Sequence, residues 1–228
     1  MRDIVGWQVI GPDAIEALVT ATVTEDLGGG VDVTSAATVP VDQRSTLDLV
    51  ARATGVVAGI PVAAAVFDVV CDPDAEIEVV SADGTRVVRG DVLLTVTGRT
   101  QQLLTAERSA LNLMCHLSGV ATATAAWADA LEGSGTRVRD TRKTTPGLRV
   151  LEKYAVRCGG GVNHRMFLSD AALVKDNHVV AAGGVAAAFD KVRAMWPGVP
   201  VEVEGDRLVT LLFVVLRPVD RLETPVLS

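Results

Sequence analysis

Hydrophobic and polar positions follow two different periods along this chain, and each period predicts a different kind of secondary structure. Over residues 12–27 the apolar side chains of Ile15, Leu18 and Val19 recur at the spacing of one helix face. A proline begins this stretch and glycines 28–30 follow it, as is typical of the two ends of a helix. The pattern therefore predicts a first helix over residues 12–27.

The next stretch changes to the two-residue period of β-strands. Residues 61–70 interrupt it with a short apolar run that predicts a helix. Asp83-Gly84 is a dipeptide typical of a hairpin turn. Strands are predicted within residues 45–60, 76–80, 87–88 and 92–96. This combination predicts a small α+β domain with a mostly antiparallel sheet.

Residues 101–132 return to helical spacing, with an expected interruption at 117–119. Arg108 shares a face with apolar neighbours in this helix, which by itself favours an arginine whose stem packs and whose charge reaches solvent. His116 is interpreted as a core histidine with satisfied hydrogen bonds.

Strands and helices alternate beyond residue 136. Strands are predicted at 137–141, 171–174 and 199–203. A helix is expected between the first two strands, with Thr145 as its N-cap and Gly159 just after its last turn. Charged residues follow the strands, among them Lys175 and Glu204. Apolar strands that alternate with helices and end in charged residues indicate a parallel sheet with a site at its carboxyl edge.

The predicted fold class is therefore α/β plus α+β. A small N-terminal α+β sandwich domain is expected over residues 1–110. An incomplete α/β-barrel domain with about three parallel strands is expected over residues 111–228, because too few residues follow for a complete eight-stranded barrel.

Charge narrows the class of ligand. Residues 137–178 hold nine Lys and Arg against four acids, so this stretch carries +5 while the whole chain carries −7. A basic stretch in an acidic protein is typical of a site for a small polyanion, and the acidic remainder disfavours nucleic acid. A solvated charged face is the alternative; Lys153 and Arg157 are interpreted as such surface charges, while Arg149 is expected near the site.

The motifs in this stretch are long and specific. They read DTRKT, PGLR, LEKYAV, GGG, NHR, LSDA and KDNH, and the helix before them contains ERSALN. Together they resemble the quinolinate phosphoribosyltransferase family over about residues 12–204. The resemblance implies transfer of phosphoribosyl from phosphoribosyl pyrophosphate to quinolinate, with release of pyrophosphate and CO2 and formation of nicotinate mononucleotide for NAD biosynthesis.

The resemblance also implies the roles of individual residues. Arg108, Arg142 and Arg165 are expected around quinolinate, with His164 orienting it and Thr141 donating a hydrogen bond. Lys143 and Lys175 are expected at the pyrophosphate and the reacting centre, and Glu204 at the ribose hydroxyls or Mg²⁺. The expected catalytic residues are Lys143, Lys175 and Glu204. The expected substrate-binding residues are Arg108, Thr141, Arg142, Lys143, His164, Arg165, Lys175 and Glu204.

Cofactor and partners follow from the same resemblance. Mg²⁺ is expected to accompany phosphoribosyl pyrophosphate, with Glu204 as a possible protein ligand. Arg108 is expected to reach the site of a neighbouring subunit in a homodimer or larger homo-oligomer. The three scattered cysteines and the lack of a targeting segment or membrane span favour a cytoplasmic protein without membrane or nucleic-acid partners.

The family pattern fades after Glu204. Residues 205–228 show a helix-like start and then two prolines, without the later acidic strand end and phosphate loops of the family. One interpretation is therefore a truncated chain that is catalytically incompetent and acts as a relic or an oligomer partner. Transfer to nicotinate, or the reaction of the molybdenum-associated relatives of the fold, is a further alternative.

Overall fold

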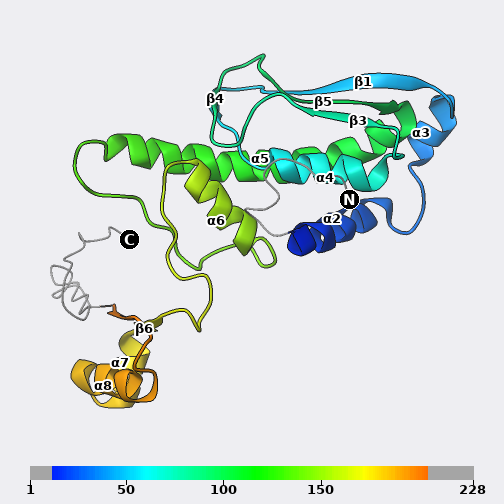
Figure 1. Ribbon diagram of the computed structural model, residues 1–228. Helices are drawn as coiled ribbons and strands as arrows, with labels where there is room; N and C mark the ends of the chain where they lie inside the picture. Colours follow the sequence, from blue (N-terminus) through cyan, green and yellow to red (C-terminus); the bar gives the residue numbers. More distant parts are fainter. Residues whose placement is uncertain (1–11, 205–228) are drawn as a thin grey trace. The chain divides into compact units, whose positions relative to one another are not determined.

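The computed structural model describes residues 12–204, and within them the chain forms two compact units (Figure 1). The larger unit includes residues up to Ala130 together with Thr144–Val162. The smaller unit includes Leu131–Lys143 and the chain from Asn163 onward. The expected boundary between residues 110 and 111 therefore falls within the larger unit. The predictions made for residues 205–228 lie outside the described residues.

An antiparallel sheet forms one layer of the larger unit (Figure 1). Its strands are β1 (Arg44–Val50), β5 (Val92–Arg99) and β3 (Glu76–Val79), in the order β1-β5-β3. A second, two-stranded antiparallel sheet pairs β2 (Gly55–Val56) with β4 (Arg86–Val87). The mostly antiparallel α+β unit predicted from the alternating pattern is thus confirmed.

Helices form the other layer, and the longest of them organises the unit (Figure 1). α5 (Thr100–Ala130) packs against α4 (Ile60–Val70), α6 (Arg149–Cys158) and α2 (Pro12–Leu27), while α3 (Val33–Thr38) lies near its start. α4 is apolar on nearly every side, and its residues from Ile60 to Phe67 are all buried. Ile15 and Val19, predicted to share the apolar face of the first helix, are fully buried. The core therefore lies between the sheet and α5, around α4.

Two local predictions for the helices are wrong. α5 continues through residues 117–119, because Leu117 is buried in the core and holds the helix there. α6 begins at Arg149, with Leu148 rather than Thr145 at its N-cap. The reason is Gly147, whose φ of 83° breaks the helical path directly after Pro146.

The hairpin predicted at Asp83-Gly84 is also wrong. β3 pairs with β5 and β4 pairs with β2, so the strands on either side of this turn belong to different sheets. The carboxylate of Asp83 instead accepts hydrogen bonds from the backbone N–H groups of Gly59 (2.9 Å) and Ile60 (3.0 Å) at the start of α4.

The smaller unit contains a strand–helix–helix–strand arrangement. β6 (Ala172–Val174) and β7 (Val201–Val203) pair in parallel, and α7 (Asp176–Ala182) and α8 (Val185–Met195) connect them. Its small core consists of Val174, Ala188 and Val201 with partly buried neighbours. These two parallel strands confirm the predictions for 171–174 and 199–203. The strand predicted over 137–141 is wrong, because only Arg139 makes a β-bridge there.

The structure thus has the mixed α/β plus α+β class predicted from the sequence. Within residues 12–204, no helix is long and apolar enough to cross a membrane.

Candidate functional site

The carboxyl ends of the two parallel strands bring a predicted pair of site residues together. Lys175 follows β6 directly and Glu204 follows β7. Their side chains form an ion pair of 2.7 Å between Nζ and Oε2, and the N–H of Glu204 donates to the carbonyl of Val174 over 2.7 Å. About half of each side chain is exposed. The two charges therefore lie at an open edge of the sheet, where a polar ligand has access.

Asp140 fixes the backbone that carries two further predicted residues. Its Oδ1 accepts from the N–H of His164 over 2.7 Å, and its Oδ2 accepts from the side-chain amide of Asn163 over 2.6 Å. Sequence reasoning assigned no role to Asp140. These bonds join the chain just before Arg142 to the chain just before Arg165.

The imidazole of His164 is held by a second acid. Its Nε2 lies 2.7 Å from Oε2 of Glu202, and the other oxygen of Glu202 lies 3.3 Å from Nη1 of Arg139. Only 13% of the His164 side chain is exposed. Glu202 therefore fixes the ring and Asp140 fixes the backbone of His164, and neither acid was predicted.

Arg165 lies in a partly buried position beside other charges. Its Nη1 donates to the carbonyl of Ala171 over 2.6 Å, while its Nε is buried without a hydrogen-bond partner in the described part of the chain. Burial and the nearby charge of Arg142 lower the pKa of Arg165, although Glu202 and Asp170 act in the opposite direction. Two guanidinium groups are thus close enough to repel each other, and an anion between them would relieve that repulsion.

The loop after Arg165 is closed by Asp170, whose Oδ2 accepts from the N–H groups of Met166 (2.7 Å) and Phe167 (2.9 Å). The loop after β-bridge residue Arg139 is closed by Thr141, whose hydroxyl oxygen accepts from the N–H of Lys143 over 3.0 Å. The two turns therefore fix the backbone next to two predicted site residues, Arg165 and Lys143.

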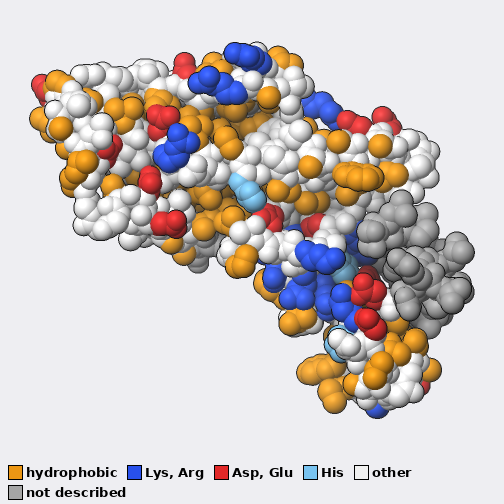
Figure 2. All heavy atoms as spheres, turned by 180° about the vertical axis from the view of Figure 1, so that it is seen from behind, with side chains coloured by type: hydrophobic (Ala, Val, Ile, Leu, Met, Phe, Trp, Pro, Cys, Tyr) orange, Lys and Arg blue, Asp and Glu red, His pale blue; other side chains and the backbone are white. Residues whose placement is uncertain are grey.

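Seven of the eight predicted site residues therefore belong to the smaller unit. They are Thr141, Arg142, Lys143, His164, Arg165, Lys175 and Glu204. The eighth, Arg108, is exposed on α5 of the larger unit, next to the buried residues Ser109 and Ala110. Figure 2 shows Lys and Arg side chains gathered on the surface with acidic and histidine side chains beside them.

A second charged cluster, in the larger unit, was not predicted. Glu152 of α6 accepts from Nε2 of His116 on α5 (2.8 Å) and from the N–H of Thr145 (3.1 Å). Burial would raise the pKa of Glu152, but the hydrogen bonds from Thr145 and His116 and the charge of His116 outweigh burial and lower it. The glutamate therefore fixes the segment that immediately follows Lys143.

Two predictions about side chains near this cluster are wrong. His116 is satisfied by Glu152, but 41% of its side chain is exposed, so it is not a core histidine. Lys153 is 1% exposed and is not a surface charge. Arg157, by contrast, is exposed, in agreement with the prediction of a surface charge, and its guanidinium carbon lies over the ring of Tyr154, 5.5 Å from the centroid.

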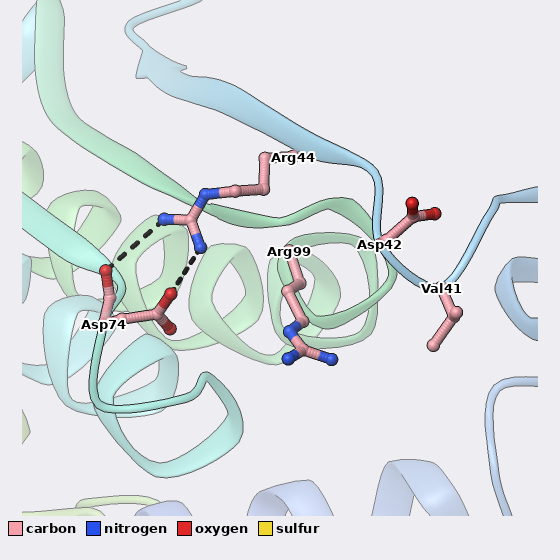
Figure 3. A pocket seen from close by; sticks show the side chains of 5 residues that line it. All are labelled: Val41, Asp42, Arg44, Asp74 and Arg99. Carbon is pink, nitrogen blue, oxygen red and sulfur yellow. Dashed lines mark hydrogen bonds and ion pairs between the residues drawn. The ribbon is translucent and has the colours of Figure 1, made fainter.

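The larger unit contains a charged pocket, and residues 12–204 contain no candidate metal cluster. No group of three or more His, Cys, Asp or Glu side chains there could hold a metal ion. A pocket of about 190 Å³ in the larger unit is lined by Val41, Asp42, Arg44, Asp74 and Arg99 (Figure 3). Arg44 binds Asp74 (2.5 Å) and Arg99 binds Asp72 (2.8 Å), so both arginines already have acidic partners.

Family models match most of the chain. The model described as the N-terminal domain of quinolinate phosphoribosyl transferase matches residues 32–118, and the model of its C-terminal domain matches residues 120–215.

Individual relatives give the same result. The chain is 50% identical over 200 residues to nicotinate-nucleotide pyrophosphorylase [carboxylating] of Mycobacterium leprae, covering 87% of this chain and 70% of that protein. It is 44% identical over 203 residues to a probable nicotinate-nucleotide pyrophosphorylase [carboxylating] of Synechocystis, covering 89% and 66%. The crystal structure of NadC from Streptococcus pyogenes superposes with a TM-score of 0.81 at 40% identity, covering 92% and 72%. The chain thus spans about two thirds to three quarters of the length of these proteins.

Proposed function

This chain belongs to the quinolinate phosphoribosyltransferase family, and we propose that it transfers the phosphoribosyl group of phosphoribosyl pyrophosphate to quinolinate. The products are nicotinate mononucleotide, pyrophosphate and CO2, in the biosynthesis of NAD. The observation that carries the proposal is the set of Arg142, Arg165 and His164 within one unit, where acids fix the histidine and the two arginines repel each other.

Quinolinate fits this set because it is a pyridine with two adjacent carboxylates. A guanidinium fork donates two parallel hydrogen bonds to a carboxylate, so Arg142 and Arg165 offer one fork for each carboxylate. His164 would orient the ring, and Thr141 would donate its hydroxyl proton to a carboxylate oxygen. Arg108 is proposed to reach the site of a neighbouring subunit in a homo-oligomer, which accounts for an arginine left exposed on α5.

The bond changes balance without a redox partner. The bond between C1 of the ribose and the pyrophosphate oxygen breaks, and pyrophosphate leaves with its electron pair. The pyridine nitrogen then forms the new bond to C1, which makes the ring positive. That charge stabilises the electron pair left on the ring carbon when the adjacent carboxylate departs as CO2, and a proton completes the product.

The side chains act on charge at each of these steps. Lys143 and Lys175 carry compact positive charges suited to the departing pyrophosphate, and either could donate the final proton. The ion pair with Glu204 holds Lys175 in place until a phosphate oxygen competes for it. Glu204 is proposed to accept hydrogen bonds from the ribose hydroxyls.

Mg²⁺ is proposed to enter with phosphoribosyl pyrophosphate. The pyrophosphate oxygens and water would supply most of its ligands, as is usual for this ion, and Glu204 could add one carboxylate oxygen. The bound ion would neutralise charge on the departing pyrophosphate. A cytoplasmic location is part of the proposal, supported by an odd, scattered set of three cysteines.

The test is a turnover assay on the purified chain. Quinolinate labelled at the carboxylate that departs is incubated with phosphoribosyl pyrophosphate and Mg²⁺, and labelled CO2 and nicotinate mononucleotide are measured. We expect equal amounts of both products, with loss of both in Arg142→Ala. Nicotinate serves as the competing substrate. Preferential use of nicotinate, or quinolinate binding with turnover at the background rate, would overturn the proposal and favour another reaction or an inactive partner subunit.

A further inference from the structure

Glu202 occupies an unusual position for an acid. It is the central residue of β7, pairs in register with Leu173 of β6, and stands between the buried Val201 and the half-buried Val203. Its side chain is 26% exposed, and both of its oxygens have partners. A strand this short and apolar does not require a carboxylate for its own packing, so the acid acts on its neighbours.

The chemistry of the contact fixes the role of one imidazole nitrogen. An ionised carboxylate has no proton to donate, so Nε2 of His164 must donate to Oε2 of Glu202 across 2.7 Å. The hydrogen bond therefore sets which ring nitrogen carries the donated proton and holds the ring plane. Carboxylates commonly accept a hydrogen bond from a functional histidine in this way without contacting the ligand themselves.

Other contacts keep Glu202 itself in place. Its second oxygen lies 3.3 Å from Nη1 of Arg139, and Asp140, the next residue along the chain, accepts from the N–H of His164. Ring and backbone of His164 are thus fixed by two separate acids. Glu202 also acts on the charge of the neighbouring Arg165.

We propose that Glu202 is a positioning residue that orients His164, and through it quinolinate, without contacting substrate. The inference rests on the proposed function and adds to it a residue that differs from Glu204, whose carboxylate is paired with Lys175 at the strand end. The geometry assigns different tasks to the glutamate within β7 and the glutamate that follows it: Glu202 orients the histidine inside the unit, and Glu204 faces the open edge.

Steady-state kinetics separate this role from a general loss of structure. In Glu202→Ala we expect KM for quinolinate to rise roughly 10-fold to 100-fold, the range for losing a hydrogen bond to a charged group, with KM for phosphoribosyl pyrophosphate within about twofold. Glu202→Gln should restore most of the affinity, because its amide oxygen still accepts from Nε2. Glu78→Gln, on the exposed face of β3, is the matched control and should leave both constants unchanged.

A double-mutant cycle tests whether Glu202 acts through His164. If it does, Glu202→Ala should have less than about a twofold further effect in a His164→Ala background. Equal effects of Glu202→Ala in both backgrounds, or equal rises in both KM values, would overturn the inference.

A spectroscopic measurement keeps the inference independent of turnover. The chain has three histidines, so ¹⁵N-histidine labelling with His164→Ala as the assignment variant identifies the ring of His164. We expect its spectrum to show a proton on Nε2 in the wild type and a changed, averaged pattern in Glu202→Ala. An unchanged ring spectrum in Glu202→Ala would refute positioning even in an active enzyme. An inactive wild type with the expected ring spectrum would refute the proposed function alone.

Discussion

Asp83 offers a quantitative test of how the larger unit is held together. Its carboxylate accepts from the backbone N–H groups of Gly59 and Ile60 at the start of α4, and from the hydroxyl of Tyr154 on α6 over 2.8 Å. One side chain thus joins a turn, the start of a buried helix and the helix that follows the candidate site. Asp83→Ala removes all three hydrogen bonds.

The expected loss can be estimated from these contacts. Removing an N-cap costs about 0.5–2 kcal/mol of stability. Tyr154 is 8% exposed, so its hydroxyl would lose its carboxylate partner in a mostly buried site, which costs about 1–3 kcal/mol. Burial raises the pKa of Asp83, because it outweighs the hydrogen bonds from Ile60, Gly59 and Tyr154. The ionised carboxylate therefore pays a desolvation cost that Asp83→Ala removes. We expect a net loss of about 2 kcal/mol in the free energy of unfolding at neutral pH.

The raised pKa also fixes the sign of the pH dependence. Because the folded state holds the Asp83 proton more tightly than the unfolded state, the stabilisation by Asp83 is greatest below its ordinary pKa and falls as pH rises through the folded value. The difference in unfolding free energy between wild type and Asp83→Ala should therefore be smaller at about pH 7 than at about pH 4.

Urea unfolding followed by the helical circular dichroism signal measures this difference. Asp42→Ala, an exposed aspartate of the same unit, is the matched control and should change stability by less than about 0.5 kcal/mol. Tyr154→Phe and the double variant complete a cycle, in which we expect a coupling of about 1 kcal/mol. A loss below about 0.5 kcal/mol in Asp83→Ala, or a difference that grows with pH, would refute the reasoning.

Three further predictions concern the site and its support. Arg165→Lys keeps the charge but loses the fork, so KM for quinolinate should rise about tenfold while KM for phosphoribosyl pyrophosphate stays constant in the turnover assay. Gly159→Ala would press a methyl carbon against the backbone carbonyl oxygen of Ala121, so thermal unfolding should show a loss of about 2 kcal/mol or more, and an unchanged Tm would contradict this. The lowered pKa of Glu152 gives stability that is present above its ordinary value and lost as pH falls through the folded value, so Glu152→Gln should flatten the acid limb of urea-unfolding stability.

Sequence periodicity predicted the helices and strands that bury either one face or nearly all of their surface. The helical spacing of Ile15 and Val19 and the apolar run of α4 give clear signals because these side chains fill the core. The strands β6 and β7 were predicted for the same reason. Their parallel pairing then accounts for the meeting of Lys175 and Glu204, since the carboxyl ends of adjacent parallel strands share one edge.

Local signals failed where tertiary contacts decide the outcome. Leu117 anchors α5 in the core, and this burial outweighs the weak helix propensity of Gly119. Asp83-Gly84 has the composition of a hairpin turn, yet its aspartate serves a helix start that lies 23 residues away in the sequence, which no local pattern can show. The division into two compact units is a further feature that no local pattern shows, because the chain leaves the larger unit after Ala130 and returns to it at Thr144.

The candidate site was predicted through its positive charges and Glu204, and the two acids that hold His164, Asp140 and Glu202, were missed. Anionic substrates require basic side chains, which points to Arg142, His164, Arg165 and the lysines. Nearby acids cannot be told from ordinary surface charges in the sequence. A partly buried positive side chain needs a hydrogen-bond acceptor that holds it in the binding orientation before substrate arrives. Without that acceptor, the side chain would turn toward water instead. Glu202 gave one detectable signal, an acid in the middle of an apolar strand. In a basic site, such an acid is better interpreted as a support for a functional cation than as a break in the hydrophobic pattern.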